Sequence, residues 1–335
     1  MTTPEIAAAA RLLEQGQLVG FPTETVYGLG ADAENPAAVA RIFAAKGRPA
    51  NHPLIVHLAP EADLAYWTRS IPPAAEQLIA AFWPGPLTLI LKRAAHIPDA
   101  VAGGQDSLGL RCPSHPVAQA LLRAFRNGRG GIAAPSANKF GHVSPTTAAH
   151  VRDEFGDPSA MLGAILDGGQ SEVGIESTIL DLSRMDSLGP VLLRPGRIGS
   201  AAIAAVIGRA PLLPDAFAPR ASGTLEAHYA PRTPVALVDV NECLALCARL
   251  AQAGRRVALI HRFAILPAGL AAQIRLPGTA EGYAHDLYAG LRAMDAERAD
   301  LIVVAAPPGA EEWQGVNDRL RRAAHDSAGI LDRLL

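Results

Sequence analysis

The sequence predicts an α/β protein with two domains: a twisted mixed sheet with flanking helices, and then a small parallel sheet wound by helices on both faces. Three observations predict this. In the long N-terminal part, helices separate many short strands, and some strands follow each other too closely for the crossover that a parallel pair requires. Composition shifts at Gly208, where a proline-rich stretch begins. From Val235 onward, strands and helices alternate. We therefore expect domains at 1–207 and 235–335, joined by a linker at 208–234.

The composition is that of a folded protein. The length of 335 residues favours two domains over one, and a chain with 49% hydrophobic and 19% charged residues is not disordered. A net charge of −2 gives no overall basic field for nucleic acid, although a local patch stays open. No apolar run reaches the roughly 18 residues of a membrane helix, and the N-terminus lacks the basic segment of a secretory signal.

The three cysteines, Cys112, Cys243 and Cys247, form neither a disulfide framework nor a paired metal-binding motif. Cys243 and Cys247 lie four apart on a predicted helix, where we expect them to be small core residues. A reducing cytoplasmic location fits this usage.

The first informative stretch is FPTETVYGLGAD, residues 21–32. The preceding residues, LVGF at 18–21, predict a short buried strand, and Pro22 ends its hydrogen bonding. Thr23, Glu24, Thr25 and Tyr27 then place hydroxyl groups and a carboxylate where that strand ends. Since ligands of open α/β sheets bind beyond the carboxyl ends of strands, the stretch is interpreted as one wall of a pocket. A polar turn after a core strand is the alternative.

The remaining N-terminal elements follow from local patterns. Asn35-Pro36 is a helix start, and that helix is predicted to end at Lys46-Gly47. Ser144-Pro145 is predicted to cap a later helix. Further predicted helices lie at 4–15, 73–82, 116–125 and 203–207. Predicted strands lie at 54–58, 87–92, 107–111 and 131–135, and in AILDGG, STILDL and VLLRPG.

The linker carries five prolines, at positions 211, 214, 219, 231 and 234, with little periodicity. An irregular stretch of this length is uncommon in a compact protein and is often functional. After it come a VALVDV strand, a helix, a VALIH strand, a helix around 286–297, a LIVVAA strand and a last helix at 316–325. This alternation predicts a small, doubly wound, Rossmann-like parallel domain.

Several charged groups stand at predicted element ends. Lys46 and Arg48 lie at a helix C-terminus, where cations are favoured by the helix dipole alone, or where they form a phosphate clamp. His57 ends an apolar strand, as a core histidine or as a ligand contact. Arg111 also ends a strand, and a buried arginine requires an anion or a carboxylate.

Short polar side chains follow other strands. Ser136 and Asn138 come directly after the GIAAP strand, and small polar groups beside backbone N–H groups can hold an anion, or simply make turns. Ser177 opens a strand, and Arg194 stands in LLRPG. Together these residues predict a polyanion site. The chain has no phosphate-binding GxxxxGK[ST] loop, no HExxH and no GxSxG, and GLGAD lacks the third glycine of a dinucleotide fingerprint.

Taken in order, these segments resemble the YrdC family of threonylcarbamoyl-AMP synthases over residues 4–207. The motifs are FPTETVYGLGAD, KGRP with PLIVH, WPGPLTLIL, SLGLRCPSHP, APSANKFGHVSPT, DGG, GIESTILD and LLRPG. The linker with HYAP and the tail with GVNDRLRRAA resemble the long form of that enzyme, which has an additional C-terminal domain. The first domain is accordingly expected to be YrdC-like.

The resemblance implies a reaction. L-Threonine, bicarbonate (or CO2) and ATP give threonylcarbamoyl-adenylate and pyrophosphate, as a nucleotidyl transfer. The product serves N6-threonylcarbamoylation of adenosine 37 in tRNA, which a separate tRNA threonylcarbamoyl-transferase complex completes. A weak direct tRNA contact is left open, and no membrane partner is expected.

The resemblance also implies site residues. Lys46, Arg48 and Arg111 are the expected catalytic groups, with Arg111 pairing the threonine carboxylate. The expected ATP contacts are Lys46, Arg48, His52, Ser107, Ser136, Asn138, Ser144, Arg194 and Tyr229. The expected threonine contacts are Thr23, Thr25, His57, Arg111, the Ala134 backbone and Ser177. Mg2+ is expected to bind through the ATP phosphates, with no protein metal cage.

One position departs from the family pattern: His52 stands where the family usually has asparagine before the proline of PLIVH. The linker acquires a role through Tyr229, which resembles a tyrosine that the long enzymes fold over the nucleotide. We hypothesise that 208–234 is a lid that excludes water from a labile adenylate.

Two other readings stay open. A nucleotide- and RNA-binding module without adenylate synthesis is the main alternative, although 5% aromatic residues argue against single-strand stacking as the main role. The carbamoyl-transferring hydrogenase-maturation proteins use a related domain, but they carry zinc-finger CxxC pairs, which this sequence lacks.

Overall fold

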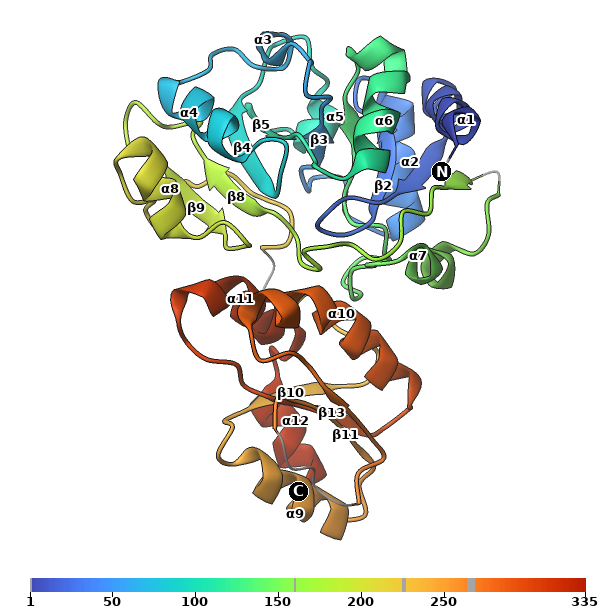
Figure 1. Ribbon diagram of the computed structural model, residues 1–335, viewed down its shortest axis with the longest axis vertical. Coiled ribbons are helices and arrows are strands. Elements are labelled where there is room, and N and C mark those ends of the chain that lie inside the picture. The colour runs from blue at the N-terminus through green and yellow to red at the C-terminus, as the bar shows by residue number, and fades with distance from the viewer. Residues whose placement is uncertain (1, 160, 225–226, 264–268) are drawn as a thin grey trace. The chain divides into compact units, whose positions relative to one another are not determined.

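The computed structural model describes the chain except for residues 1, 160, 225–226 and 264–268 (Figure 1). The chain divides into two compact units. The first is Met1–Phe140 with Pro145–Thr224, and the second is Gly141–Ser144 with Leu225–Leu335. Four residues from within the sequence of the first unit therefore belong to the second by their contacts.

The first unit alternates short strands with helices, as the sequence predicts. Its strands are β1 (Leu18–Phe21), β2 (Gly28–Asp32), β3 (Ile55–His57), β4 (Leu87–Lys92), β5 (Ser107–Arg111), β6 (Ile132–Ala133), β7 (Leu162–Ile165), β8 (Thr178–Asp181) and β9 (Val191–Arg194). Its helices are α1 (Thr3–Glu14), α2 (Pro36–Lys46), α3 (Leu64–Trp67), α4 (Pro73–Phe82), α5 (Asp99–Ala102), α6 (Pro116–Ala124), the 3-10 turn η1 (Phe125–Gly128), α7 (Ala148–Phe155) and α8 (Ser200–Ile207).

Among the described residues, the strands form one sheet in the order β7-β1-β2-β6-β3-β5-β4-β8-β9. The pairs β1–β7, β3–β5 and β4–β8 are parallel, whereas β1–β2, β2–β6, β3–β6, β4–β5 and β8–β9 are antiparallel. The predicted mixed sheet with flanking helices is thus confirmed.

Strand β1 shows why both sheet faces carry helices. All four of its residues are buried, so the strand is apolar throughout rather than alternating. Leu18 packs in the core cluster that includes Val39 and Ile42 of α2, while Val19 and Phe21 pack in the cluster that includes α1 and α6. Since neighbouring side chains of a strand point to opposite faces, the two clusters lie on the two sides of the sheet.

The GLGAD segment is a strand, β2. It pairs antiparallel with β1, with Phe21 opposite Gly28. A Cβ atom on Gly30 would lie 2.9 Å from atoms of Phe21 and Ile132. Glycine is therefore required here by the protein's own core packing, and FPTETVYGLGAD is a hairpin whose tip carries the threonines.

Two helix boundaries test the capping predictions. The Asn35 side chain accepts hydrogen bonds from the Ala37 and Ala38 N–H groups, and α2 ends at Gly47 with a positive φ of 63°, as predicted. The predicted cap at Ser144 is wrong: α7 begins at Ala148, and Thr147 accepts from the His150 N–H.

The second unit is a small parallel sheet with helices. Its elements are β10 (Val235–Val238), α9 (Cys243–Gln252), β11 (Val257–His261), β12 (Ala272–Arg275), α10 (Ala280–Ala296), β13 (Leu301–Ala305), the 3-10 turn η2 (Glu311–Trp313), α11 (Gln314–Ala323) and α12 (Ser327–Leu334). Within the described residues the strand order is β10-β13-β11-β12, and each neighbouring pair is parallel. Strand β12 and helix α12 were not predicted from the sequence.

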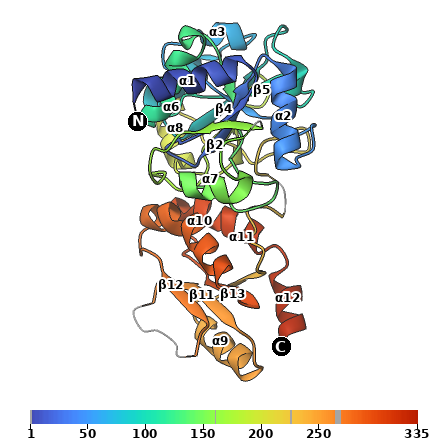
Figure 2. The same cartoon turned by 90° about the vertical axis from the view of Figure 1, so that its right-hand side faces the viewer.

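Helices cover both faces of this second sheet (Figure 2). One face packs against α9 and α12, in a cluster that includes Cys243, Cys247 and Val257. Helices α10 and α11 pack on the other side, where Ile260 and Val304 are buried. The doubly wound arrangement and the core role of the two cysteines are confirmed.

The described residues of the predicted linker form no helix or strand, yet they are tied to the protein. Leu212 donates its N–H to the Pro190 carbonyl at 2.8 Å and accepts from the Leu192 N–H at 2.9 Å. Arg184 pairs with Asp215 at 2.9 Å. The stretch as far as Thr224 belongs to the first unit, and the stretch from Leu225 belongs to the second.

Candidate active site

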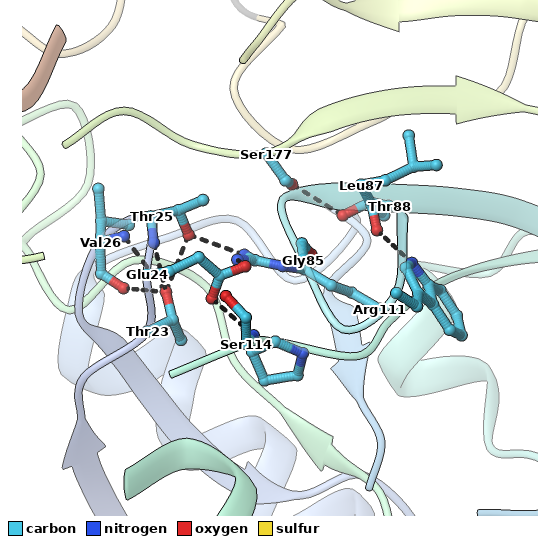
Figure 3. Close-up of polar contacts among 12 residues, drawn as sticks. Thr23, Glu24, Thr25, Val26, Gly85, Leu87, Thr88, Arg111, Ser114 and Ser177 are labelled. Atoms are coloured by element: carbon cyan, nitrogen blue, oxygen red, sulfur yellow. Dashed lines mark hydrogen bonds and ion pairs between the residues drawn. The ribbon is translucent and has the colours of Figure 1, made fainter. Parts of the chain in front are cut away.

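A buried ion pair stands at the centre of the predicted threonine site (Figure 3). Nη2 of Arg111, at the end of β5, lies 2.6 Å from Oε1 of Glu24 in the β1–β2 hairpin. Arg111 Nη1 donates to Thr25 Oγ1 at 2.8 Å, and Arg111 Nε donates to the Gly85 carbonyl at 3.3 Å. Glu24 Oε2 accepts from the Ser114 N–H at 3.1 Å. The buried arginine thus has the carboxylate partner that its burial requires.

Within the described residues, these bonds use three of the five guanidinium N–H groups of Arg111. Two N–H groups are therefore left to meet a ligand carboxylate. Glu24 holds the guanidinium in place from one side, so that a second carboxylate would approach a preoriented fork rather than a mobile side chain.

The two hairpin threonines have defined proton directions. Thr23 Oγ1 donates its single proton to the Val26 carbonyl at 2.6 Å. In its 2.8 Å contact with Thr25 Oγ1, Thr23 must then accept, so the Thr25 hydroxyl donates. The chain of donation runs from Arg111 through Thr25 to Thr23 and Val26, as the dashed lines in Figure 3 show. Three of the predicted threonine contacts are therefore in one network.

His57 ends β3 directly opposite Arg111 of β5. Burial, reinforced by the positive charge of Arg111, lowers the pKa of His57 to about 3. The ring packs edge-on against Phe21, with 6.0 Å between ring centroids, and its Nδ1 has no hydrogen-bond partner in the described structure. The imidazole is accordingly neutral at physiological pH and can donate or accept only as a neutral group.

Lys46 is the centre of the predicted nucleotide site. Its Nζ donates to the Ser136 carbonyl at 2.6 Å and to the Asn138 carbonyl. Three predicted ATP contacts are thus adjacent, although 90 residues separate Lys46 from Ser136. Burial and the neighbouring Arg48 charge hold the pKa of Lys46 well below its usual range. The negative charge of a polyanion bound here would raise this pKa again.

Arg194 and Ser177 connect the two predicted sites. Arg194, predicted to contact ATP, donates through Nε and Nη2 to the Ser177 carbonyl at 3.1 and 2.9 Å, and through Nη2 to Ser177 Oγ at 3.2 Å. Ser177, predicted to contact threonine, also shares a 2.8 Å hydrogen bond with Thr88 (Figure 3). A nucleotide contact and an amino-acid contact therefore meet at one serine.

Ser222 of the linker touches two of the cations. Arg48 Nη2 lies 3.2 Å from Ser222 Oγ and 2.9 Å from the Pro53 carbonyl, and Arg194 Nη1 donates to the Ser222 carbonyl at 2.8 Å. These linker contacts lie within the first unit. The linker thus reaches the cationic side chains that the sequence assigned to ATP.

The remaining predicted contacts in the first unit are peripheral to these networks. His52 packs edge-on against Phe140 at 5.5 Å, and burial together with the Arg48 and Arg220 charges lowers its pKa. Ser107 is buried and lines a small cavity with Ser222. The Ala134 N–H is already used by the Ile55 carbonyl at 3.0 Å. A ligand would therefore meet the Ala134 carbonyl rather than its N–H.

Ser144 and Tyr229 belong to the second unit. Tyr229 is buried, with its ring centroid 4.1 Å from that of His228 and 5.7 Å from that of Tyr288. The guanidinium carbon of Arg319 lies 5.6 Å from the Tyr229 ring centroid. The assignment of Ser144 and Tyr229 to ATP stays a prediction.

Sequence reasoning placed Glu24 in one wall of a pocket and Ser222 in the lid, but it gave neither residue a contact of its own, and it gave no site role to Gly85 or Thr88. Glu24 lies between Thr23 and Thr25 in the sequence. The available signal for its role was that a carboxylate there could pair with an arginine at a strand end. The others contribute a backbone carbonyl or a hydroxyl whose position depends on long-range strand pairing. Local sequence carries no information on such contacts.

Among the described residues, no group of three or more histidine, cysteine or acidic side chains is placed to hold a metal ion. None of the described helices is long and apolar enough to cross a membrane.

Known proteins match both parts of the chain. The family model described as "Telomere recombination" matches residues 11–196, and the model described as "Threonylcarbamoyl-AMP synthase, C-terminal domain" matches 198–325. The threonylcarbamoyl-AMP synthase of Pyrococcus abyssi is 38% identical over 96% of this chain and 94% of its own length. The threonylcarbamoyl-AMP synthase of Bacillus subtilis is 39% identical over 96% of this chain and 93% of its own.

A solved structure agrees with these sequence matches. The crystal structure of Pyrococcus abyssi Sua5 complexed with L-threonine superposes with a TM-score of 0.88 at 35% identity, covering 98% of this chain and 96% of that one. On sequence and structure, the chain belongs to the threonylcarbamoyl-AMP synthase family, in the long form that carries the C-terminal domain.

Proposed function

We propose that this protein condenses L-threonine, bicarbonate or CO2, and ATP into L-threonylcarbamoyladenylate and pyrophosphate. The threonine amine adds to the carbon of CO2 and loses a proton, which gives a carbamate. A carbamate oxygen then attacks the α-phosphorus of ATP, and the bond to the β-phosphate oxygen breaks to release pyrophosphate. Such a reaction depends on positioning and charge neutralisation more than on covalent help from the protein.

The contact between Arg194 and Ser177 supports this proposal most directly, because it joins a predicted nucleotide contact to a predicted threonine contact. The carbamate must attack the α-phosphate, so the amino acid and the nucleotide have to bind side by side. A shared serine between the two sets of residues is the arrangement that this requirement predicts.

The proposed roles follow from chemistry. Arg111, held by Glu24, binds the threonine carboxylate, and Thr23, Thr25 and His57 hold the rest of the amino acid. Lys46, Arg48 and Arg194 neutralise the phosphates. Mg2+ would enter with the nucleotide rather than in a protein cage, and it would help to neutralise the charge of the phosphates.

The proposed organisation has a catalytic domain at 1–207, a lid at 208–234 and a C-terminal domain at 235–335. The adenylate then serves the cytoplasmic tRNA threonylcarbamoyl-transferase complex, which forms N6-threonylcarbamoyladenosine at position 37. The contacts of Ser222 with Arg48 and Arg194 agree with a linker that covers the nucleotide.

Pyrophosphate release from ATP tests the proposal, with threonine and bicarbonate each omitted in turn. Release should require both, and it should fall in Lys46→Ala and Arg111→Ala. Lys92→Ala and Arg129→Ala, at exposed positions, are matched controls that should keep wild-type release. If ATP binds but no mixture releases pyrophosphate, the proposal is wrong, and a salt-dependent tRNA titration would test the RNA-binding alternative.

A further inference from the structure

The C-terminal unit contains buried polar atoms that have no role in the proposed reaction. Its four parallel strands place their carboxyl ends at one edge of the sheet. Three segments follow neighbouring strands there: Arg262 comes directly after β11, Trp313 follows β13, and Tyr283 lies early in α10 after β12. Open α/β sheets bind ligands at this edge, beyond the strand ends.

These three side chains lie together. The guanidinium carbon of Arg262 is 5.2 Å from the centroid of the Trp313 ring, and the Tyr283 ring meets Trp313 edge-on at 5.6 Å. Tyr283 is 0% exposed and Trp313 is 4% exposed. The arginine is close enough to Tyr283 to act electrostatically on the ionisation of its phenol, while burial raises the Tyr283 pKa. Tyr283 is therefore a protonated hydroxyl donor.

Two donors in this group have no acceptor. Among the described residues, Arg262 Nε and Tyr283 Oη are buried and make no hydrogen bond. Native proteins rarely leave such groups unsatisfied, and each exception calls for a bound water, ion or ligand. Since both groups are donors, and one carries a positive charge, the missing partner has the chemistry of an acceptor with negative charge.

We propose that Arg262 and Tyr283, beside the Trp313 ring, form a binding site for an oxyanion group, a carboxylate or a phosphate, in the C-terminal unit. The guanidinium lies over the indole ring, and its N–H groups would donate to the anion. The Tyr283 hydroxyl supplies a second, uncharged donor.

The site is independent of the proposed synthase chemistry, because it uses none of the residues assigned to ATP or threonine. Trp313 is one of three tryptophans, and the other two, Trp67 and Trp83, lie in the first unit. A 1H–15N spectrum of the full chain therefore contains three indole N–H signals, and the one that disappears in Trp313→Phe belongs to Trp313. That signal reports the second unit, and the other two report the first.

The experiment titrates the 15N-labelled protein with inorganic phosphate and, separately, with acetate, each against sodium chloride at matched ionic strength. We expect one of the two anions to shift the Trp313 signal saturably. The anion that does so identifies the ligand class. Arg262→Gln should weaken that binding at least about tenfold, since it removes charge-assisted hydrogen bonds. Tyr283→Phe, which keeps the ring, should weaken it severalfold.

Arg249→Gln, at an exposed arginine on α9, is the matched control and should leave the titration unchanged. The proposal is overturned if neither anion shifts the Trp313 signal beyond the chloride control. It is equally overturned if the shift persists unchanged in both Arg262→Gln and Tyr283→Phe. A protein that releases no pyrophosphate could still show the expected Trp313 shift and its loss in the variants. The anion site and the proposed synthase activity are therefore tested independently.

Discussion

Nη2 of Arg111 lies 2.6 Å from Oε1 of Glu24, and the two side chains are only 4% and 3% exposed. The pair is complete without any substrate. The Arg111 guanidinium is therefore a fixed cation whose charge is already partly balanced by the protein.

We expect Glu24→Gln to destabilise the protein by about 3–5 kcal/mol, because it leaves the Arg111 charge buried without its carboxylate. Equilibrium urea unfolding measures the loss. The double variant Glu24→Gln/Arg111→Met should recover part of it, since it removes the uncompensated charge. Glu61→Gln breaks the exposed pair with Arg123 and should have no measurable effect. Equal effects of the Glu24 and Glu61 changes would contradict the prediction.

ATP binding should take up a proton at Lys46. Burial and Arg48 lower the pKa of Lys46 in the ligand-free protein, and the negative phosphates would raise it again. At any pH between the two values, binding converts the neutral amine to ammonium. Calorimetric titration in buffers of different ionisation enthalpy measures this uptake. The proton uptake should disappear in Lys46→Met and persist in Lys92→Met. If it were unchanged in Lys46→Met, a group other than Lys46 would take up the proton.

His57 should make the protein less stable in acid. Its folded-state pKa of about 3 lies below the ordinary value of 6.5, so between these two values the unfolded chain binds more protons. The free energy of unfolding therefore falls as pH falls through this window, by at most about 1.4 kcal/mol per pH unit from this group. His57→Gln should flatten the profile measured by urea unfolding between pH 6.5 and 4. His325→Gln, at an exposed histidine, should keep the wild-type slope, and an identical slope in both variants would refute the assignment.

Gly131 should not tolerate even a methyl group. A Cβ there would lie 2.5 Å from atoms of Trp67 and Val56, in the fully buried core beside β6. We expect Gly131→Ala to lower stability by about 1–3 kcal/mol through overpacking, seen as a lower thermal midpoint. Gly309→Ala, where nothing lies within 4 Å, is the control and should leave the midpoint nearly unchanged. If Gly131→Ala and Gly309→Ala had the same thermal midpoint, the core around Trp67 would be able to relax and the prediction would be wrong.

Local patterns predicted those features that local forces determine. The α2 boundaries followed from Asn35 and Gly47, because capping and the left-handed glycine are properties of a few adjacent residues. The parallel C-terminal sheet followed from strand–helix alternation, because only a crossover connection allows such a sheet. Ser144 is not the cap because Thr147, three residues later, takes that position: its hydroxyl oxygen accepts a hydrogen bond from the His150 N–H.

Residues whose contacts come from distant strands could not be placed by local rules. A partner for Arg111 could be expected on electrostatic grounds, but its identity as Glu24 depends on the tertiary fold. The tip of the β1–β2 hairpin reaches the end of β5, although β6 and β3 stand between β2 and β5 in the sheet. The same holds for Thr88 and Ser177, which are 89 residues apart in sequence. The resemblance to a known family supplied the candidate contacts, and the structure shows which of them touch.

The segment Gly141–Ser144 connects the folding of the two units. The His142 backbone forms a parallel bridge with Ala230, the Gly141 carbonyl accepts from the Ala230 N–H, and the Val143 carbonyl accepts from Arg292. These carbonyls belong to a loop within the sequence of the first unit, but their donors, Ala230 and Arg292, come later in the chain. On a ribosome, the first unit would therefore emerge with this loop still lacking its partners, and the loop could reach its final form only once the C-terminal unit has been synthesised.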